Sequence, residues 1–128
     1  MILGIGLDLC DIGRMNDAIE RPHFVDRVYT AAEAERIRSA SDVRRGEIAA
    51  GLFAAKEAVA KALGTGFSKF GTADIEITPD PDGRPLCALH NNALAQARAM
   101  CGGSDDFQIW VSITHEKGMA AATAILEG

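Results

Sequence analysis

Two acidic residues stand where they could bind a metal ion. Asp8 follows the segment Gly4-Ile5-Gly6-Leu7, and Glu57 lies inside the apolar-periodic segment 42–63. Carboxylate oxygens suit Mg²⁺, which usually takes one or two protein carboxylates and fills its other positions with water and substrate phosphate. Each residue also has an ordinary use, Asp8 in capping a turn and Glu57 in a surface ion pair. Only the two together indicate a metal site.

Two lysines lie close to Glu57 in the sequence, Lys56 directly before it and Lys61 four residues after it. Glu57 and Lys61 are in the favourable order for an i, i+4 pair on a helix, which stabilises an exposed helix by about 0.2–0.5 kcal/mol. The alternative is that these cations meet a phosphate group. Small side chains surround them and would let a ligand approach closely: Ala54, Ala58, Ala60 and Ala62.

Two further segments each allow a structural and a functional interpretation. Gly64-Thr65-Gly66 is a helix-ending signal, and it could equally be a loop whose backbone N–H groups bind phosphate. His115 follows Ser112-Ile113-Thr114 at a predicted strand-to-turn junction, as an ordinary turn histidine or as a ligand-binding group. The chain has no G-x-S-x-G elbow, which disfavours a Ser-His hydrolase. Gly4-Ile5-Gly6 lacks the third glycine of a dinucleotide-binding loop.

Composition narrows the class of protein. A chain of 128 residues fits one domain over residues 1–128. The formal net charge of −5 argues against a nucleic-acid binder. Three cysteines without a C-x-x-C spacing indicate free thiols in a reducing cytoplasm. An aspartate interrupts the apolar N-terminal segment and no basic residue precedes it, so we expect neither a signal peptide nor a membrane span.

Arginines gather in the first third of the chain. Acidic residues alternate with them, which is typical of a solvated helical face. The functional alternative is that some of them face an acidic partner. The arginines in question are Arg14, Arg21, Arg27, Arg36, Arg38, Arg44 and Arg45.

The positioning elements follow from periodicity and turn signals. The pattern predicts strands at 2–8, 73–78, 85–89, 107–114 and 119–126. It predicts helices at 12–19, 23–29, 30–39, 42–63 and 91–100. A capping box at Thr30 and Glu33 opens the third helix, and the turn 115–118 closes a hairpin. The order predicts an α+β fold in which a mostly antiparallel sheet packs on one long helix.

Several segments taken in order resemble one protein family. They are GIGLDLCDIGRM, FVDRVYTAAEAERI, FAAKEAVAKALGTG, DGRP and SITHEKGMAAATAI, which together span nearly the whole chain. The resemblance is to the holo-[acyl-carrier-protein] synthase family of 4′-phosphopantetheinyl transferases. It implies Mg²⁺-dependent transfer of the phosphopantetheine arm of coenzyme A to a serine of an apo acyl carrier protein. Adenosine 3′,5′-bisphosphate leaves, and the expected setting is fatty-acid biosynthesis.

The resemblance also implies residue roles, carried over one position at a time. The metal ligands fall on Asp8 and Glu57, and the catalytic residues on Glu57 and Lys61. The expected contacts to the carrier protein are Arg14 and Arg21. The expected contacts to coenzyme A and its phosphates are Arg45, Lys56, Gly64, Thr65, Gly66 and His115. The family further implies a homotrimer with active sites between subunits.

Three questions stay open at this point. The proton acceptor could be Glu57 or a metal-bound water. A non-catalytic module that binds coenzyme A or a carrier protein would not need the carboxylate pair. A metal-dependent phosphohydrolase would use water in place of a protein serine.

Overall fold

The order of helices and strands follows the prediction. A computed structural model describes residues 1–128, which form five strands, five α-helices and two short 3-10 turns, η1 and η2. In chain order the elements are β1 (Ile2–Asp11), α1 (Ile12–Ala18), α2 (Phe24–Val28), α3 (Ala31–Ser39), α4 (Asp42–Ala62), η1 (Gly66–Ser68), η2 (Thr72–Asp74), β2 (Ile75–Pro79), β3 (Pro85–Leu89), α5 (Asn91–Met100), β4 (Gln108–Glu116) and β5 (Met119–Glu127).

All strand pairs are antiparallel, as predicted for this α+β fold. Three strands form one sheet in the order β1-β5-β4, and β2 with β3 forms a separate ribbon. In the larger sheet Asp8 lies opposite Ala122, and Ala122 lies opposite Ile113. The two strands that carry predicted site residues, β1 and β4, are therefore separated by β5.

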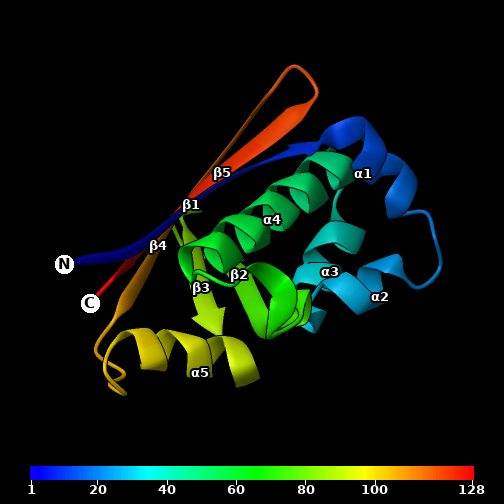
Figure 1. The fold of residues 1–128 in the computed structure, drawn as a ribbon. Helices are drawn as coiled ribbons and strands as arrows, with labels where there is room; N and C mark the ends of the chain where they lie inside the picture. Colours follow the sequence, from blue (N-terminus) through cyan, green and yellow to red (C-terminus); the bar gives the residue numbers. More distant parts are fainter.

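The long helix α4 lies along the three-stranded sheet, and α1, α2 and α3 gather at one end of it (Figure 1). Glycine in β1 allows the close approach. A Cβ atom at Gly4 would lie 1.8 Å from Ala62 O, and one at Gly6 would lie 1.8 Å from Ala58 O. The glycines thus mark a close backbone contact, which is one of the two uses that glycine has inside a strand.

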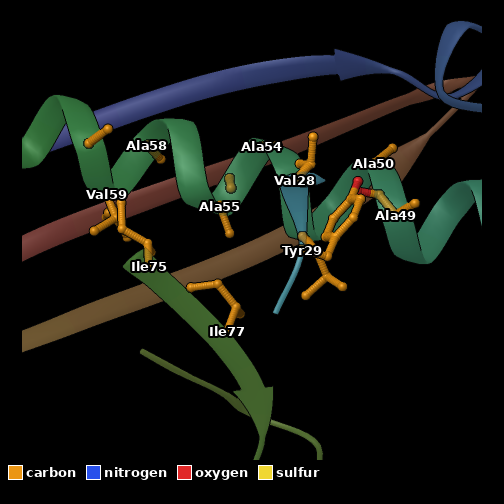
Figure 2. Close-up of a cluster of buried hydrophobic side chains, with 14 of the residues drawn as sticks. Val28, Tyr29, Ala49, Ala50, Ala54, Ala55, Ala58, Val59, Ile75 and Ile77 are labelled. Carbon is orange, nitrogen blue, oxygen red and sulfur yellow. The ribbon is translucent and has the colours of Figure 1, made fainter. Parts of the chain in front are cut away.

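Small side chains dominate the core. More than half of the 26 buried apolar residues are alanines, and many of these lie on α4. Figure 2 shows that α4 packs on its other side against Ile75 and Ile77 of β2 and against Tyr29. Since the larger sheet covers one side of α4 and these residues cover another, the helix is buried over most of its circumference.

Local signals explain most element boundaries. Thr30 and Glu33 form the predicted capping box at the start of α3, and Asp11 caps α1 through Arg14 N at 2.9 Å.

The C-terminal hairpin differs from the prediction, because β4 continues through His115 to Glu116. Its turn is only Lys117-Gly118, both with positive φ (51° and 81°), the backbone that a tight two-residue hairpin requires. His115 is therefore a strand residue.

Candidate active site

Three of the predicted site residues meet beside the edge strand β1. Lys61 Nζ donates to Asp8 Oδ1 and to Leu7 O, each at 2.9 Å. The Leu7 bond satisfies a carbonyl on the free edge of the sheet. Glu57 lies one helical turn before Lys61 on α4, and it forms no hydrogen bond or ion pair within the chain. The structure thus brings Asp8, Glu57 and Lys61 into one cluster, which we call the carboxylate cluster.

Burial and the neighbouring charge of Asp8 disfavour the ionised form of Glu57. Burial, and then the negative charge of Asp8, raises the pKa of the Glu57 carboxyl above its ordinary value of 4.5, while Lys61 opposes the shift. Two carboxylates close enough to influence each other favour a shared cation. No group of three or more His, Cys, Asp or Glu residues that could hold a metal exists in the chain. A pair of carboxylates fits Mg²⁺, which usually takes one or two protein carboxylates and completes its shell with phosphate and water.

The segment Gly64-Thr65-Gly66 follows directly after α4. Both glycines have positive φ, 81° and 57°, and Gly64 lies three residues beyond Lys61. Gly64 N donates to Lys61 O at 2.9 Å, so the segment does end the helix. The segment also begins a loop close to the carboxylate cluster, and the two interpretations therefore coexist.

His115 lies away from the carboxylate cluster, in a hollow of about 200 Å³ that is lined in part by the 79–85 turn. Its Nε2 is 3.8 Å from Glu47 Oε2. Arg36 and Arg44 line the same hollow, and neither forms an ion pair with a carboxylate of the chain. The hollow therefore presents two unpaired guanidinium groups beside the histidine, which suits an anionic ligand.

This histidine hollow and the carboxylate cluster lie on different sides of α4. Ile48 lines the hollow, and Glu57 is nine residues further along the helix. Nine residues are two and a half turns at 3.6 residues per turn, so the two side chains point in opposite directions. His115 and Asp8 are likewise on the two outer strands of the sheet. One copy of the chain does not direct both groups at one small ligand.

Lys56 is not at the site, contrary to the prediction of a coenzyme A phosphate contact. Its side chain is 0% exposed, and its Nζ lies 2.6 Å from Glu33 Oε1. The ammonium also donates to Thr72 O at 2.8 Å and to Ile75 O. Lys56 points into the interior because it lies on the side of α4 that faces β2.

Arg45 is also occupied within the chain. Its guanidinium donates to Asp42 Oδ1 at 2.8 Å, to Ala40 O at 3.0 Å and to Arg38 O at 3.2 Å. It thereby satisfies carbonyls at the end of α3, which have no partner inside the helix. The neighbouring Arg44, which sequence reasoning did not select, is the one that lines the histidine hollow. Its spacing of four from Ile48 puts both on one helical face, but only the fold shows which face meets His115.

The two arginines expected to contact a partner come together. Arg14 and Arg21 line one hollow of about 280 Å³ next to the carboxylate cluster. Its remaining walls are mostly apolar and include Leu9, Met15 and Phe53. Two cations around an apolar floor, close to Asp8, form a surface suited to an acidic protein with exposed apolar side chains.

Comparison with known families decides the class of protein. A family model described as the 4′-phosphopantetheinyl transferase superfamily matches residues 4–115, which include both the carboxylate cluster and His115. The chain belongs to this superfamily. The predicted enzyme class is confirmed, since this phosphopantetheinyl transferase is also 47% identical over 128 residues to the holo-[acyl-carrier-protein] synthase of Clostridium novyi (strain NT). That match covers 99% of this chain and 88% of the relative.

Solved structures agree with the fold of this phosphopantetheinyl transferase. The holo-[acyl-carrier-protein] synthase of Neisseria meningitidis superposes with a TM-score of 0.84 at 29% identity, covering 100% of both chains. A holo-(acyl-carrier-protein) synthase from Bacillus anthracis, in complex with CoA (3′,5′-ADP), gives 0.82 at 32% identity and covers 100% of this chain and 98% of that one. The predicted fold class is confirmed. No helix here has the length and apolar character needed to cross a membrane.

Proposed function

We propose that this protein transfers the 4′-phosphopantetheine arm of coenzyme A to a serine of an apo acyl carrier protein, with Mg²⁺ as cofactor. The observation that carries the proposal is the convergence of Asp8, Glu57 and Lys61 at the start of the Gly64–Gly66 loop. Relatives named holo-[acyl-carrier-protein] synthase support the substrates, and a related structure in complex with CoA supports the nucleotide.

The chemistry is a displacement at phosphorus. The carrier serine Oγ forms a bond to the phosphorus that bears pantetheine, and the bond from this phosphorus to the bridging oxygen breaks. Adenosine 3′,5′-bisphosphate leaves with that oxygen. Reactions of this kind depend mainly on positioning and on neutralising the charge of the transition state. The chain's contribution is therefore expected to be charge placement.

Each member of the carboxylate cluster has a role in that scheme. Asp8 and Glu57 would hold Mg²⁺, which supplies Lewis-acid polarisation and neutralises phosphate charge when it is bound. The Lys61 ammonium, already directed at Asp8, stabilises negative charge that develops on the phosphate oxygens. The serine proton would go to Glu57, which has a raised pKa and no partner in the chain, or to a water at the metal.

The carrier protein would dock in the hollow between Arg14 and Arg21. Acyl carriers are acidic partners in this scheme, so the two guanidinium groups steer association, and the apolar wall provides contact area. Docking there would bring the carrier serine toward Asp8, which precedes Leu9 of the hollow on the same strand. Fatty-acid biosynthesis in the cytoplasm is the proposed setting.

We further propose a homotrimer whose active sites lie between subunits. The sheet face that turns away from α4 carries exposed apolar side chains, among them Ile5 (70% exposed), Leu7, Leu9 and Trp110 (46% exposed). Exposed apolar surface of this kind usually marks an interface. Association through this face would bring the histidine hollow of one copy to the carboxylate cluster of another, which a single chain does not achieve.

The trimer can be tested by mixing inactive variants. Glu57→Gln and His115→Ala are each expected to lose most activity, and a mixture refolded from equal amounts should regain about a quarter of the sites by chance pairing. Sedimentation analysis should give three copies of the 13.5 kDa chain. A monomer that remains fully active would contradict the shared site.

The transfer reaction is tested by the intact mass of an apo acyl carrier protein after incubation with the enzyme and coenzyme A. We expect a gain of one phosphopantetheine that requires Mg²⁺ and is lost in Glu57→Gln. Binding of coenzyme A without any mass gain, on several carriers and with folded enzyme, would favour the non-catalytic module. Release of adenosine bisphosphate without a carrier would favour the phosphohydrolase.

A further inference from the structure

The buried pair Lys56–Glu33 joins four segments of the chain. Glu33 Oε1 accepts from Thr30 N at 2.8 Å, and its Oε2 accepts from Ile77 N at 2.7 Å, in addition to the contact with Lys56. Both side chains are 0% exposed, and every buried side-chain nitrogen or oxygen has a partner. A buried ion pair offsets its desolvation only when such extra bonds complete it. Here that condition is met.

The hydrogen bond from Lys56 to Thr72 closes a segment of the chain that contains most of the proposed site residues. Lys56 Nζ and Thr72 O are 16 residues apart in sequence and 2.8 Å apart in space. Between them lie Glu57, Lys61 and the Gly64–Gly66 segment, that is, most of the groups to which the proposed function assigns metal or phosphate contacts. The chain outside this segment provides Asp8 and His115.

Other anchors of this segment are apolar or local. Gln96 donates to Leu63 O at 2.9 Å, Phe67 packs on the core and edge-on against the buried Phe70, and Gly71 N donates to Asp74 Oδ2 at 3.1 Å. Gly64, Ser68, Lys69 and Gly71 are exposed. A surface loop of this kind can open locally at a lower free-energy cost than the core once one of its ends is released. The Lys56 ammonium fixes the far end by binding both Thr72 O and Ile75 O.

We propose that Lys56, held by Glu33, is a positioning residue for the phosphate-binding loop 64–71, so that its removal weakens coenzyme A binding selectively. Lys56 does not touch the substrate. It acts by holding the end of the loop against the middle of α4. Lys56 directly precedes Glu57 in the sequence. The proposal rests on the proposed function for its kinetic consequence only, since the loop's mobility can be measured without any substrate.

The alternative is that the pair only stabilises the fold. In that case the folded fraction of a variant would bind both substrates normally, and only the amount of active enzyme would change. A positioning role predicts that the KM values for the two substrates respond differently. The KM for coenzyme A rises while the KM for the carrier protein stays the same, because the carrier hollow at Arg14 and Phe53 lies outside the segment that Lys56 closes.

The experiment compares three variants with the wild type, well below their melting temperatures. Lys56→Met removes the ammonium. Glu33→Gln with Lys56→Met removes both charges and keeps an amide oxygen for Ile77 N, which protects folding. Ile37→Ala, at a buried position in α3 that lines a hollow with Val43 and Arg45 at the opposite end of α4 from the loop, serves as a destabilised control.

We expect the KM for coenzyme A to rise about tenfold in both Lys56 variants, with the carrier KM within about twofold of the wild type. Tryptic cleavage after the exposed Lys69 should accelerate about tenfold relative to cleavage after the exposed Lys117. Ile37→Ala should change neither ratio.

Two results would overturn the positioning role. One is a double variant with wild-type KM values and wild-type protection of Lys69. The other is an equal shift in Ile37→Ala. If the wild type itself transfers nothing, the proposed function fails, and the cleavage ratio at Lys69 still decides whether Lys56 holds the loop.

Discussion

Lys56 and Lys61 lie five residues apart on α4, and each pairs with a carboxylate, yet their surroundings are opposite. The Lys56–Glu33 pair is fully buried at 2.6 Å, whereas the side chains of the Lys61–Asp8 pair, at 2.9 Å, are 51% and 19% exposed. The first pair is completed by four backbone groups. The second leaves Glu57 beside it without a partner.

This difference separates a structural ion pair from one that can change partners. A buried charge cannot be left alone without a large cost, so the Lys56 pair is fixed. An exposed pair is screened by water and contributes little to folding. Lys61 can therefore exchange Asp8 for an incoming phosphate at little cost. Four predictions can break or sharpen this comparison.

The largest expected effect is the loss of stability in Lys56→Met. Removing one partner leaves the Glu33 carboxylate buried without its cation, which costs about 3–5 kcal/mol of unfolding free energy. Urea unfolding at neutral pH measures the loss. A variant as stable as the wild type would contradict the structural role of the pair.

Lys61→Met should behave in the opposite way. We expect turnover to fall about 10²–10³-fold, because the charge opposite the developing anion is gone. The unfolding free energy should change by about 1 kcal/mol or less, since the Lys61 side chain is half exposed to solvent. Initial rates at saturating coenzyme A and parallel urea unfolding measure both quantities. Intact turnover would remove Lys61 from the mechanism.

Arg14→Ala extends the comparison to a cation that forms no ion pair in the chain. We expect the KM for the carrier protein to rise severalfold and its salt dependence to flatten, while turnover at saturation holds. Arg98→Ala is the matched control, because Arg98 is an exposed arginine paired with Asp105 at the other end of the chain. Equal salt responses in the two variants would exclude steering by Arg14.

The smallest expected effect concerns Glu57 in metal-free protein. Its folded-state pKa is raised by burial and by Asp8, so the ionised form opposes folding at neutral pH. Glu57→Gln should therefore raise the melting temperature slightly at pH 8. The gain should shrink as the pH falls through the raised pKa and disappear below 4.5, where Glu57 is protonated in both states. A gain that persists in acid would have another cause.

Much of the fold was predictable because its signals are local. The capping box at Thr30 and Glu33, the two glycines of the C-terminal loop of α4 and the final hairpin are set by residues close in sequence. Gly4 and Gly6 lie in a predicted strand, where glycine often marks the close approach of another backbone or of a ligand, and the neighbour here is the backbone of α4. The i, i+4 spacing of Glu57 and Lys61 likewise fixed their shared face, and the segment pattern fixed the family.

Only the tertiary structure decided which cations are available to a ligand. Lys56 and Arg45 were expected to meet phosphate. Lys56 is buried, whereas Arg45 binds the end of α3 but is 41% exposed, so its phosphate contact stays a prediction. Arg44 faces the histidine hollow in place of Arg45. Neighbouring residues on a helix point about 100° apart, so the choice depends on what packs on each side. Alanines occur around nearly the whole circumference of α4, so no polar stripe marks its solvent-facing side. That side is set by the elements that pack on the helix, namely β2, α3 and the larger sheet.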